Sequence, residues 1–326
     1  MAFEIGVASD HVDLWDKLLA FLTTNPDLVA TGQNWSIGWQ APVGAPNETD
    51  CVVVGPGTGG TDQIYVGLRR VDNPATDHYT LWMNGMTGLL TGATQITEHV
   101  NVSERVAVYL DSAPMNYWFV ANGRRFMAVV KIATIYEALY GGLFLPYADP
   151  LQYSYPLFIG GSVKRTRGDD LNFNWGDTDN SHRNYTLSTG NPFGGSYDRP
   201  ATAYMLSPSA EWKHVSYSAG AGSAFLRPFY PAGGLGTNTS ASQGAGLTSM
   251  LDKMRECLGG GFSLDPATLV SNDPVDQTYG TLDGVYHTPS ETNYSENLIT
   301  VGGVDHLVFQ NIWRTDGRYL AAMALE

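Results

Sequence analysis

The dipeptide Asn122-Gly123 constrains the fold of this chain more than any other sequence feature. It separates two strand-like runs, residues 117–121 and 125–130, both rich in aromatic and β-branched side chains. Asn-Gly takes up the positive φ angles of a two-residue type I′ turn, whose twist matches that of antiparallel strands. We therefore predict a β-hairpin with a type I′ turn at Asn122 and Gly123. Replacing Gly123 by Val would then cost about 1 to 3 kcal/mol through backbone strain.

A second dipeptide of this kind, Asp316-Gly317, lies near the end of the sequence. It separates residues 306–313 from residues 318–324, two further strand-like runs, and predicts a C-terminal hairpin. Other segments with alternating or continuous apolar side chains are also expected to form strands. They are residues 51–54, 63–71, 105–110, 202–206 and 212–217.

Amphipathic helix patterns are few. One begins after Ser9 or Asp10, both good N-caps, and ends at Pro26. Its apolar residues share one face: Leu14, Trp15, Leu18, Leu19 and Leu22. A second helix is predicted over residues 250–258, stopped by the three glycines that follow.

These patterns predict an α+β protein, mainly antiparallel β with a few short helices. Regular alternation of strands and helices is missing from the sequence, so a doubly wound parallel sheet is not expected. Two segments rich in Gly, Ser, Asn and Thr read as long loops, residues 168–200 and 231–246. We predict two lobes: an α+β lobe over residues 1–167 that contains the Asn-Gly hairpin, and a loop-rich, mainly β lobe over residues 168–326.

The composition favours contacts with other proteins. Charged residues make up 15% of the 326 residues, while the chain carries 18 Tyr and 8 Trp. Protein interfaces are enriched in aromatic side chains and depleted in Lys and Glu. The formal net charge is −14, and binding to nucleic acid requires clustered Lys and Arg. The basic group Lys164, Arg165 and Arg167 is too short to reverse that, so nucleic acid is not an expected partner.

The sequence gives no sign of export or membrane insertion. A basic segment followed by an apolar core is missing from the first residues, which argues against a signal peptide. Runs of about 18 apolar residues, as a membrane span needs, are also missing. We expect a soluble protein made in a cytoplasm, which is compatible with release by lysis.

Short motifs with known chemistry are weak here. Residues 55–60 spell the glycine pattern of a dinucleotide-binding loop, but the strand-like residues 62–68 follow instead of the required helix. Cys51 and Cys257 are too far apart in sequence to suggest a disulfide scaffold or a metal site. Motifs of serine hydrolases and zinc proteases were not found. The sequence therefore predicts neither a catalytic site nor a cofactor.

One segment resembles a calcium loop in composition. Its candidate ligands are Asp170, Asn172, Asn174 and Asp177, since Ca²⁺ binds six to eight oxygens. Trp175 stands where an EF-hand has glycine, and no Glu closes the loop. Turns in which Asp and Asn bond to their own backbone give the same composition. We therefore expect no bound metal and no change in melting temperature with EDTA.

The aromatic residues are the more informative candidates. Tyrosines beside prolines in turns suit a contact surface or a sugar-binding platform, although about half of such rings must belong to the core. The interaction candidates are Trp118, Tyr147, Tyr153, Tyr155, Trp175 and Tyr185.

Several of these segments resemble a family of tailed-bacteriophage virion structural proteins, encoded among tail and baseplate genes. The segments that carry the resemblance are residues 117–131, 136–147, 155–162, 279–286 and 309–314. The opening helix with Trp15 also fits. The resemblance implies incorporation into the particle, with no known reaction or cofactor.

We therefore expect a non-enzymatic structural subunit of a phage virion, located in the tail or baseplate. Its expected partners are copies of itself and other tail or baseplate proteins. One alternative is a tail protein that binds a host receptor or surface glycan. Another is a glycan depolymerase, which would need two carboxylates facing each other across a groove.

Overall fold

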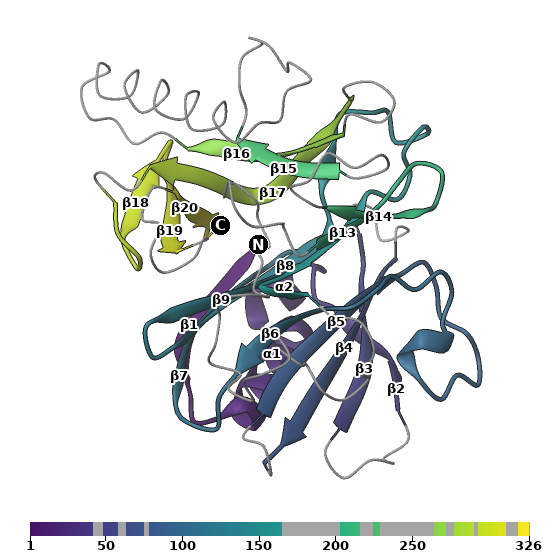
Figure 1. The fold of residues 1–326 in the computed structure, drawn as a ribbon, viewed down its shortest axis with the longest axis horizontal. Helices are drawn as coiled ribbons and strands as arrows, with labels where there is room; N and C mark the ends of the chain where they lie inside the picture. Colours follow the sequence, from purple (N-terminus) through teal and green to yellow (C-terminus); the bar gives the residue numbers. More distant parts are fainter. Residues whose placement is uncertain are drawn as a thin grey trace, which may run out of the picture.

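The protein is built mainly from β-strands (Figure 1). A computed structural model describes residues 1–41, 48–57, 63–74, 78–164, 203–215, 224–228, 264–271, 277–289, 293–310 and 319–325. The first strands in chain order are β1 (Ala2–Ala8), β2 (Ser36–Gln40), β3 (Glu48–Gly55), β4 (Ile64–Asn73), β5 (His78–Met86), β6 (Val106–Leu110), β7 (Met115–Ala121), β8 (Arg125–Ile132), β9 (Ile135–Leu143) and β10 (Leu145–Pro146). The remaining strands are β11 (Leu157–Gly161), β12 (Val163–Lys164), β13 (Ala203–Leu206), β14 (Trp212–Val215), β15 (Ala224–Pro228), β16 (Asp265–Ser271), β17 (Gln277–Pro289), β18 (Leu298–Val301), β19 (Val304–Gln310) and β20 (Tyr319–Ala324).

The predicted N-terminal helix is confirmed as α1 (His11–Thr24). Asp10 caps it, because its carboxylate accepts hydrogen bonds from the backbone N–H groups of Val12 and Asp13, both at 2.9 Å. A short helix that the sequence did not predict, α2 (Pro26–Ala30), follows directly with Pro26 in its first turn. The described residues also include a 3-10 turn, η1 (Ile96–Glu98).

The strands form two sheets. The larger, sheet A, has the order β1-β7-β8-β9-β11-β13-β14-β15-β16-β17-β20-β19-β18, with β10 paired to β17. The smaller, sheet B, has the order β12-β6-β5-β4-β3-β2. Every described pairing is antiparallel except that of β14 with β15. This confirms the predicted α+β, mainly antiparallel fold class.

The predicted Asn-Gly hairpin is confirmed as β7 and β8, but its turn type was predicted wrongly. The antiparallel register pairs Ala121 with Phe126, and Asn122 donates its backbone N–H to the Arg125 carbonyl at 2.9 Å. Neither Asn122 nor Gly123 has a positive φ. Instead, the Asn122 carboxamide oxygen accepts from the N–H groups of Arg124 (2.8 Å) and Arg125 (3.0 Å), so the asparagine side chain closes the turn.

Gly123 is needed for a different reason from the one predicted. A Cβ at this position would lie 3.1 Å from the Gly57 carbonyl oxygen and 3.2 Å from a Pro56 side-chain carbon. The Gly57 N–H also donates to the Gly123 carbonyl at 2.8 Å. The hairpin loop therefore packs against the glycine-rich end of β3, where there is little space for a side chain.

The other predicted strands are found close to their expected bounds. The C-terminal hairpin is confirmed as the antiparallel pair β19 and β20, although its turn at residues 316–317 lies outside the described residues. The predicted strands at residues 51–54, 63–71, 105–110, 202–206 and 212–217 correspond to β3, β4, β6, β13 and β14. After the glycine-rich end of β3, the next described element is strand β4, as expected from the strand-like residues 62–68, and not the helix that a dinucleotide-binding loop requires.

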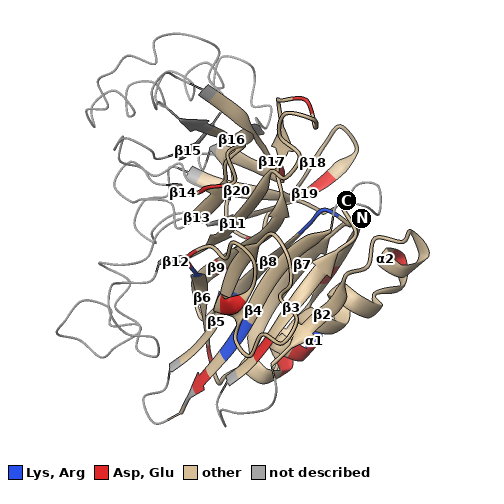
Figure 2. Ribbon diagram, turned by 90° about the vertical axis from the view of Figure 1, so that its right-hand side faces the viewer, with Lys and Arg blue, Asp and Glu red and all other residues tan. Residues whose placement is uncertain are grey.

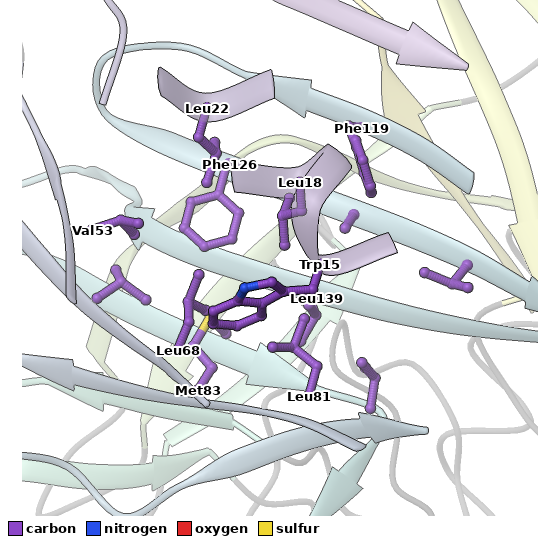
Figure 3. Packing of buried hydrophobic residues seen from close by; sticks show 14 of the residues in the cluster. Trp15, Leu18, Leu22, Val53, Leu68, Leu81, Met83, Phe119, Phe126 and Leu139 are labelled. Atoms are coloured by element: carbon purple, nitrogen blue, oxygen red, sulfur yellow. The ribbon is translucent and has the colours of Figure 1, made fainter. Parts of the chain in front are cut away.

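The buried residues fall into two main groups on opposite faces of β7, β8 and β9. One group, core cluster 1, lies between α1, sheet B and one face of sheet A. Figure 3 shows Trp15 and Leu18 of α1 among residues of both sheets, including Leu68 and Phe119. The other group, core cluster 2, joins the opposite face of sheet A to the C-terminal strands through residues such as Phe309.

Three predictions made from the sequence lie outside the described residues. They are the helix at residues 250–258 and the two long loops, at 168–200 and 231–246. The predicted boundary between residues 167 and 168 also falls there and stays a prediction. Sheet A itself continues past that point, because β11 pairs with β13.

Among the described residues, no helix is long and apolar enough to cross a membrane.

Candidate interaction surface

Strand β1 presents an exposed apolar stripe at an open edge of sheet A. Its side chains alternate between two faces, and Phe3, Ile5 and Val7 lie on the same one. Their exposed fractions are 51%, 51% and 56%. Among the described strands, β1 pairs with β7 alone, so its outer backbone edge is unpaired. We call Phe3, Ile5 and Val7 the β1 stripe.

The β1 stripe lies on the same face of sheet A as core cluster 2, whose buried side chains extend as far as β7. In the antiparallel register, Phe3 is opposite Val120 and Ile5 is opposite Trp118. Both partners on β7 are buried in core cluster 2, together with Leu307 of β19. The C-terminal strands therefore cover β7 on this face but leave the apolar row of β1 exposed.

The opposite face of β1 is fixed to the core of the protein. The Tyr117 hydroxyl donates a hydrogen bond of 2.7 Å to the Glu4 carboxylate. Burial and this carboxylate raise the pKa of Tyr117 above its usual range. The Tyr117 ring lies over Gly6, where a Cβ would come within 2.5 Å of the hydroxyl oxygen. The charge of Glu4 thus faces away from the β1 stripe.

Sequence reasoning missed this surface, although the sequence contains the signal. Residues 2–8 read Ala-Phe-Glu-Ile-Gly-Val-Ala, with large apolar side chains at every second position. That alternation is typical of a strand with one apolar face.

The aromatic candidates from the sequence separate into buried and exposed residues. Trp118 and Tyr153 are buried within the chain, so their rings offer little surface to a partner. Tyr155 is half-buried, with its hydroxyl bonded to the Gln63 carbonyl. Tyr147 is 58% exposed and is the candidate that faces solvent. Trp175 and Tyr185 lie outside the described residues.

Tyr147 is carried by a loop that is attached to sheet A. Its backbone N–H donates to the Tyr279 carbonyl at 2.9 Å, next to the β10–β17 pairing. A turn follows in which the Asp149 carboxylate accepts from the Leu151 N–H at 2.8 Å. Leu151 is almost fully exposed. The loop is therefore held in place and presents two apolar side chains to solvent.

A buried charged group joins the hairpin loop to β17. Arg125 is fully buried, and its Nε lies 3.5 Å from Oδ2 of Asp283. The same oxygen is 3.0 Å from the Arg124 guanidinium and 3.2 Å from the Asn122 carboxamide nitrogen. One carboxylate thus faces three donors, an arrangement that holds two distant segments of the chain together. Nothing in the sequence linked Asp283 to this hairpin.

A second charged group lies at the other end of β8. The Lys131 ammonium and the Tyr136 hydroxyl both bond to the Glu296 carboxylate. The hydrogen bond from Lys131 is the main cause that lowers the pKa of Glu296. Glu296 in turn raises the pKa of Lys131. This group connects β8 and β9 to the segment before β18.

Charged residues are otherwise sparse along much of the ribbon that Figure 2 shows in colour. Within the part of the chain that the structure describes, no three His, Cys, Asp or Glu side chains are grouped to hold a metal ion. The calcium candidates Asp170, Asn172, Asn174 and Asp177 lie outside that part. Cys51 is buried and unpaired, and burial raises its pKa to about 12.

No protein-family model matches this chain, and neither does any curated protein sequence.

Proposed function

We propose that this protein is a non-enzymatic structural subunit of a tailed-phage virion, located in the tail or baseplate. The observation that carries the proposal is the β1 stripe: three large apolar side chains, each more than half exposed, on an unpaired strand edge. Water-exposed surface of this kind on a sheet edge is costly for an isolated monomer and favours association. A subunit of an assembly covers such an edge with a neighbour.

The charge distribution supports the same function. Several charged side chains serve to hold the chain together, as Asp283 does for Arg124 and Arg125. The surface is correspondingly poor in charge, with 15% charged residues in the whole sequence. A surface with few charges and many aromatic rings suits broad contacts between proteins.

The assignment to a phage tail rests on the resemblance between sequence segments. The described parts of these segments form strands near the centre of the architecture. Residues 117–131 are the β7–β8 hairpin, residues 136–147 include most of β9, and residues 155–162 contain β11. Residues 279–286 lie in β17. The resemblance therefore lies in strands of sheet A. It supports a shared fold more directly than a shared ligand.

Localisation in the particle tests the proposal. Phage particles carrying an epitope-tagged copy of this chain would be purified, analysed by mass spectrometry and imaged by negative stain with a gold-labelled antibody. We expect several copies per particle, with gold at the tail or its tip. Particles without the tag are the control for labelling. Absence of the chain from purified particles, or labelling confined to the head, would contradict the proposal.

Glycan binding is a second candidate function, favoured by the exposed Tyr147 on its fixed loop. An exposed tyrosine ring can stack on a sugar while its loop remains ordered. Tyr147→Ala should then abolish binding on a glycan array. Tyr294→Ala is the matched control, because Tyr294 is also well exposed but lies beside β18. Equal effects of the two substitutions would count against a specific sugar site at Tyr147.

A further inference from the structure

We propose that β1 is the contact between two copies of this chain, which pair their β1 strands antiparallel about a two-fold axis through Ile5. This inference adds a specific self-assembly contact to the proposed function. Its physical argument depends on β1 alone. Adding a strand from a second copy would satisfy the unpaired backbone groups of the edge. Both β1 stripes would lie on the same face of one continuous sheet.

The sequence of β1 is self-complementary in this register. With Ile5 opposite Ile5 of the second copy, Phe3 is opposite Val7, and Val7 is opposite Phe3. On the other face, Glu4 is opposite Gly6, so the two carboxylates do not face each other. Every large apolar side chain thus has an apolar cross-strand neighbour, at about 5 Å between Cβ atoms.

The neighbouring symmetric registers are less favourable. Two-fold pairing requires that opposite side chains lie on the same face. Centring the axis on Glu4 places two carboxylates directly opposite each other, which is destabilising. Centring it on Gly6 leaves Phe3 opposite Ser9, beyond the end of the strand. The register centred on Ile5 is the one that matches all three residues of the β1 stripe.

The edge of β1 lacks most of the features that usually prevent such pairing, and its one charged side chain, Glu4, accepts a hydrogen bond from Tyr117 of the same chain. Its seven residues include neither Lys nor Pro, and its pairing with β7 runs without a register shift. The opposite edge of sheet A is β18, which has four residues, and its Thr300 hydroxyl donates a hydrogen bond of 2.6 Å to the Asp305 carboxylate of β19. Pairing of β1 with β18 of a neighbour would therefore match fewer apolar positions than pairing of β1 with itself.

Cysteine cross-linking tests the register directly. Substitutions would be made in a Cys257→Ser background, and the buried Cys51 would be left in place. We expect Ile5→Cys to form a disulfide-linked dimer on mild oxidation, because opposite Cα atoms of paired strands are about 4.5 to 5.5 Å apart, within the range of a disulfide. Phe3→Cys alone should not cross-link to itself, since its two copies would be separated by about 14 Å along the strands.

A mixture of the Phe3→Cys and Val7→Cys proteins should give a cross-linked heterodimer, whereas neither protein alone should do so. Leu298→Cys on β18 is the control for random collisions, because its side chain is also more than half exposed. Cross-linking of Leu298→Cys to Phe3→Cys, without cross-linking of Ile5→Cys to itself, would overturn the proposal in favour of pairing between β1 and β18.

Charge substitutions test the same register without oxidation. Ile5→Lys places two like charges opposite each other, and the dimer dissociation constant measured by sedimentation should rise about tenfold or more. Phe3→Lys or Val7→Glu alone should also weaken the dimer. The double variant should restore it, because each introduced lysine is opposite an introduced glutamate. Leu298→Lys should leave the dissociation constant unchanged.

The single substitutions fall on exposed side chains, and circular dichroism would verify that each variant folds. A monomer at every concentration tested, or a dimer that Ile5→Lys does not weaken, would overturn the proposal. These outcomes leave the virion assignment standing, since that depends on where the chain is found in purified particles. The opposite combination, a β1 dimer absent from particles, would refute the virion assignment alone.

Discussion

Strands β7, β8 and β9 are covered on both faces, but in different ways. On one face, core cluster 1 packs apolar side chains from α1 and sheet B against the strands. On the other, core cluster 2 is apolar at its centre and is bounded by charged groups at both ends of β8. Arg125 faces Asp283 at one end, and Lys131 faces Glu296 at the other.

The difference separates two sources of stability. The α1 face depends on the hydrophobic effect and close packing, which have little directional preference. The charged groups of the C-terminal face contribute less energy but require particular partners at particular places. They fix where the C-terminal strands sit on β8. Substitutions on the two faces should therefore differ in size and in dependence on pH.

The largest loss of stability is expected for a substitution on the α1 face. Phe126 is fully buried and packs edge-on against Trp35, with ring centroids 5.2 Å apart. Phe126→Ala should lower the free energy of unfolding by about 3 to 5 kcal/mol, through lost burial and the cavity left behind. Chemical denaturation would measure this. Phe3→Ala, the same substitution at a half-exposed ring, should cost far less; equal losses would contradict the comparison.

The second-largest loss of stability is expected at Asp283, in the charged group of the C-terminal face. Asp283→Asn removes the charge opposite the fully buried Arg125. We expect a loss of about 2 to 3 kcal/mol, below the value for a completely buried pair because Asp283 keeps some contact with water. Thermal unfolding would measure it, with Asp16→Asn on the exposed side of α1 as the control. A loss no larger than that of the control would show that Asp283 does not hold the two segments together.

A smaller effect is expected at the hairpin loop that adjoins both faces. Gly123→Ala would place a Cβ 3.1 Å from the Gly57 carbonyl oxygen. We expect a loss of about 1 to 2 kcal/mol from overpacking. Gly88→Ala is the control, since its Cβ would meet Val100 at an ordinary 3.7 Å. If both variants unfold at the same denaturant concentration, the contact between this loop and β3 is not tight.

The smallest effect is expected at Glu296. Lys131 lowers the pKa of Glu296 from its usual value of 4.5. The interaction therefore stabilises the folded protein fully above the usual pKa, and this contribution is lost as the pH falls through the lowered pKa. Glu296→Gln should cost less than about 1 kcal/mol at pH 7, because the pair is partly exposed. The difference in melting temperature from the unsubstituted protein should disappear in acid; a constant difference would contradict the assignment.

The features that sequence reasoning predicted correctly are those defined by nearby residues. Asp10 and the apolar stripe of α1 define a helix locally, and the runs flanking Asn122-Gly123 define a hairpin locally. The turn type was predicted wrongly because the Asn122 side chain, and not a pair of positive φ angles, closes the turn. Gly57 and Pro56, more than sixty positions away, also occupy the space beside Gly123, a contact that local sequence does not reveal.

The candidate surface was harder to predict. Proximity to proline placed Tyr147 and Tyr153 together as candidates, yet one is exposed and the other is enclosed by Phe144 and Tyr279. The pairing of Arg125 with Asp283 joins residues far apart in sequence. The alternation of apolar side chains in β1 is visible in the sequence. The exposure of these side chains, however, depends on where the C-terminal strands end. Such information lies in the tertiary structure, which a single sequence does not contain.

The pairing of β1 with β7 also has a consequence during synthesis. Glu4 and its hydrogen-bond partner Tyr117 are 113 residues apart. At about 5 to 20 residues per second, a ribosome needs roughly 6 to 23 seconds to extend the chain from one strand to the other. Throughout this interval the nascent β1 lacks β7, the strand with which it pairs. Ribosomes translating one message carry such strands close together, so overproduction at high temperature should cause aggregation before the chain is complete.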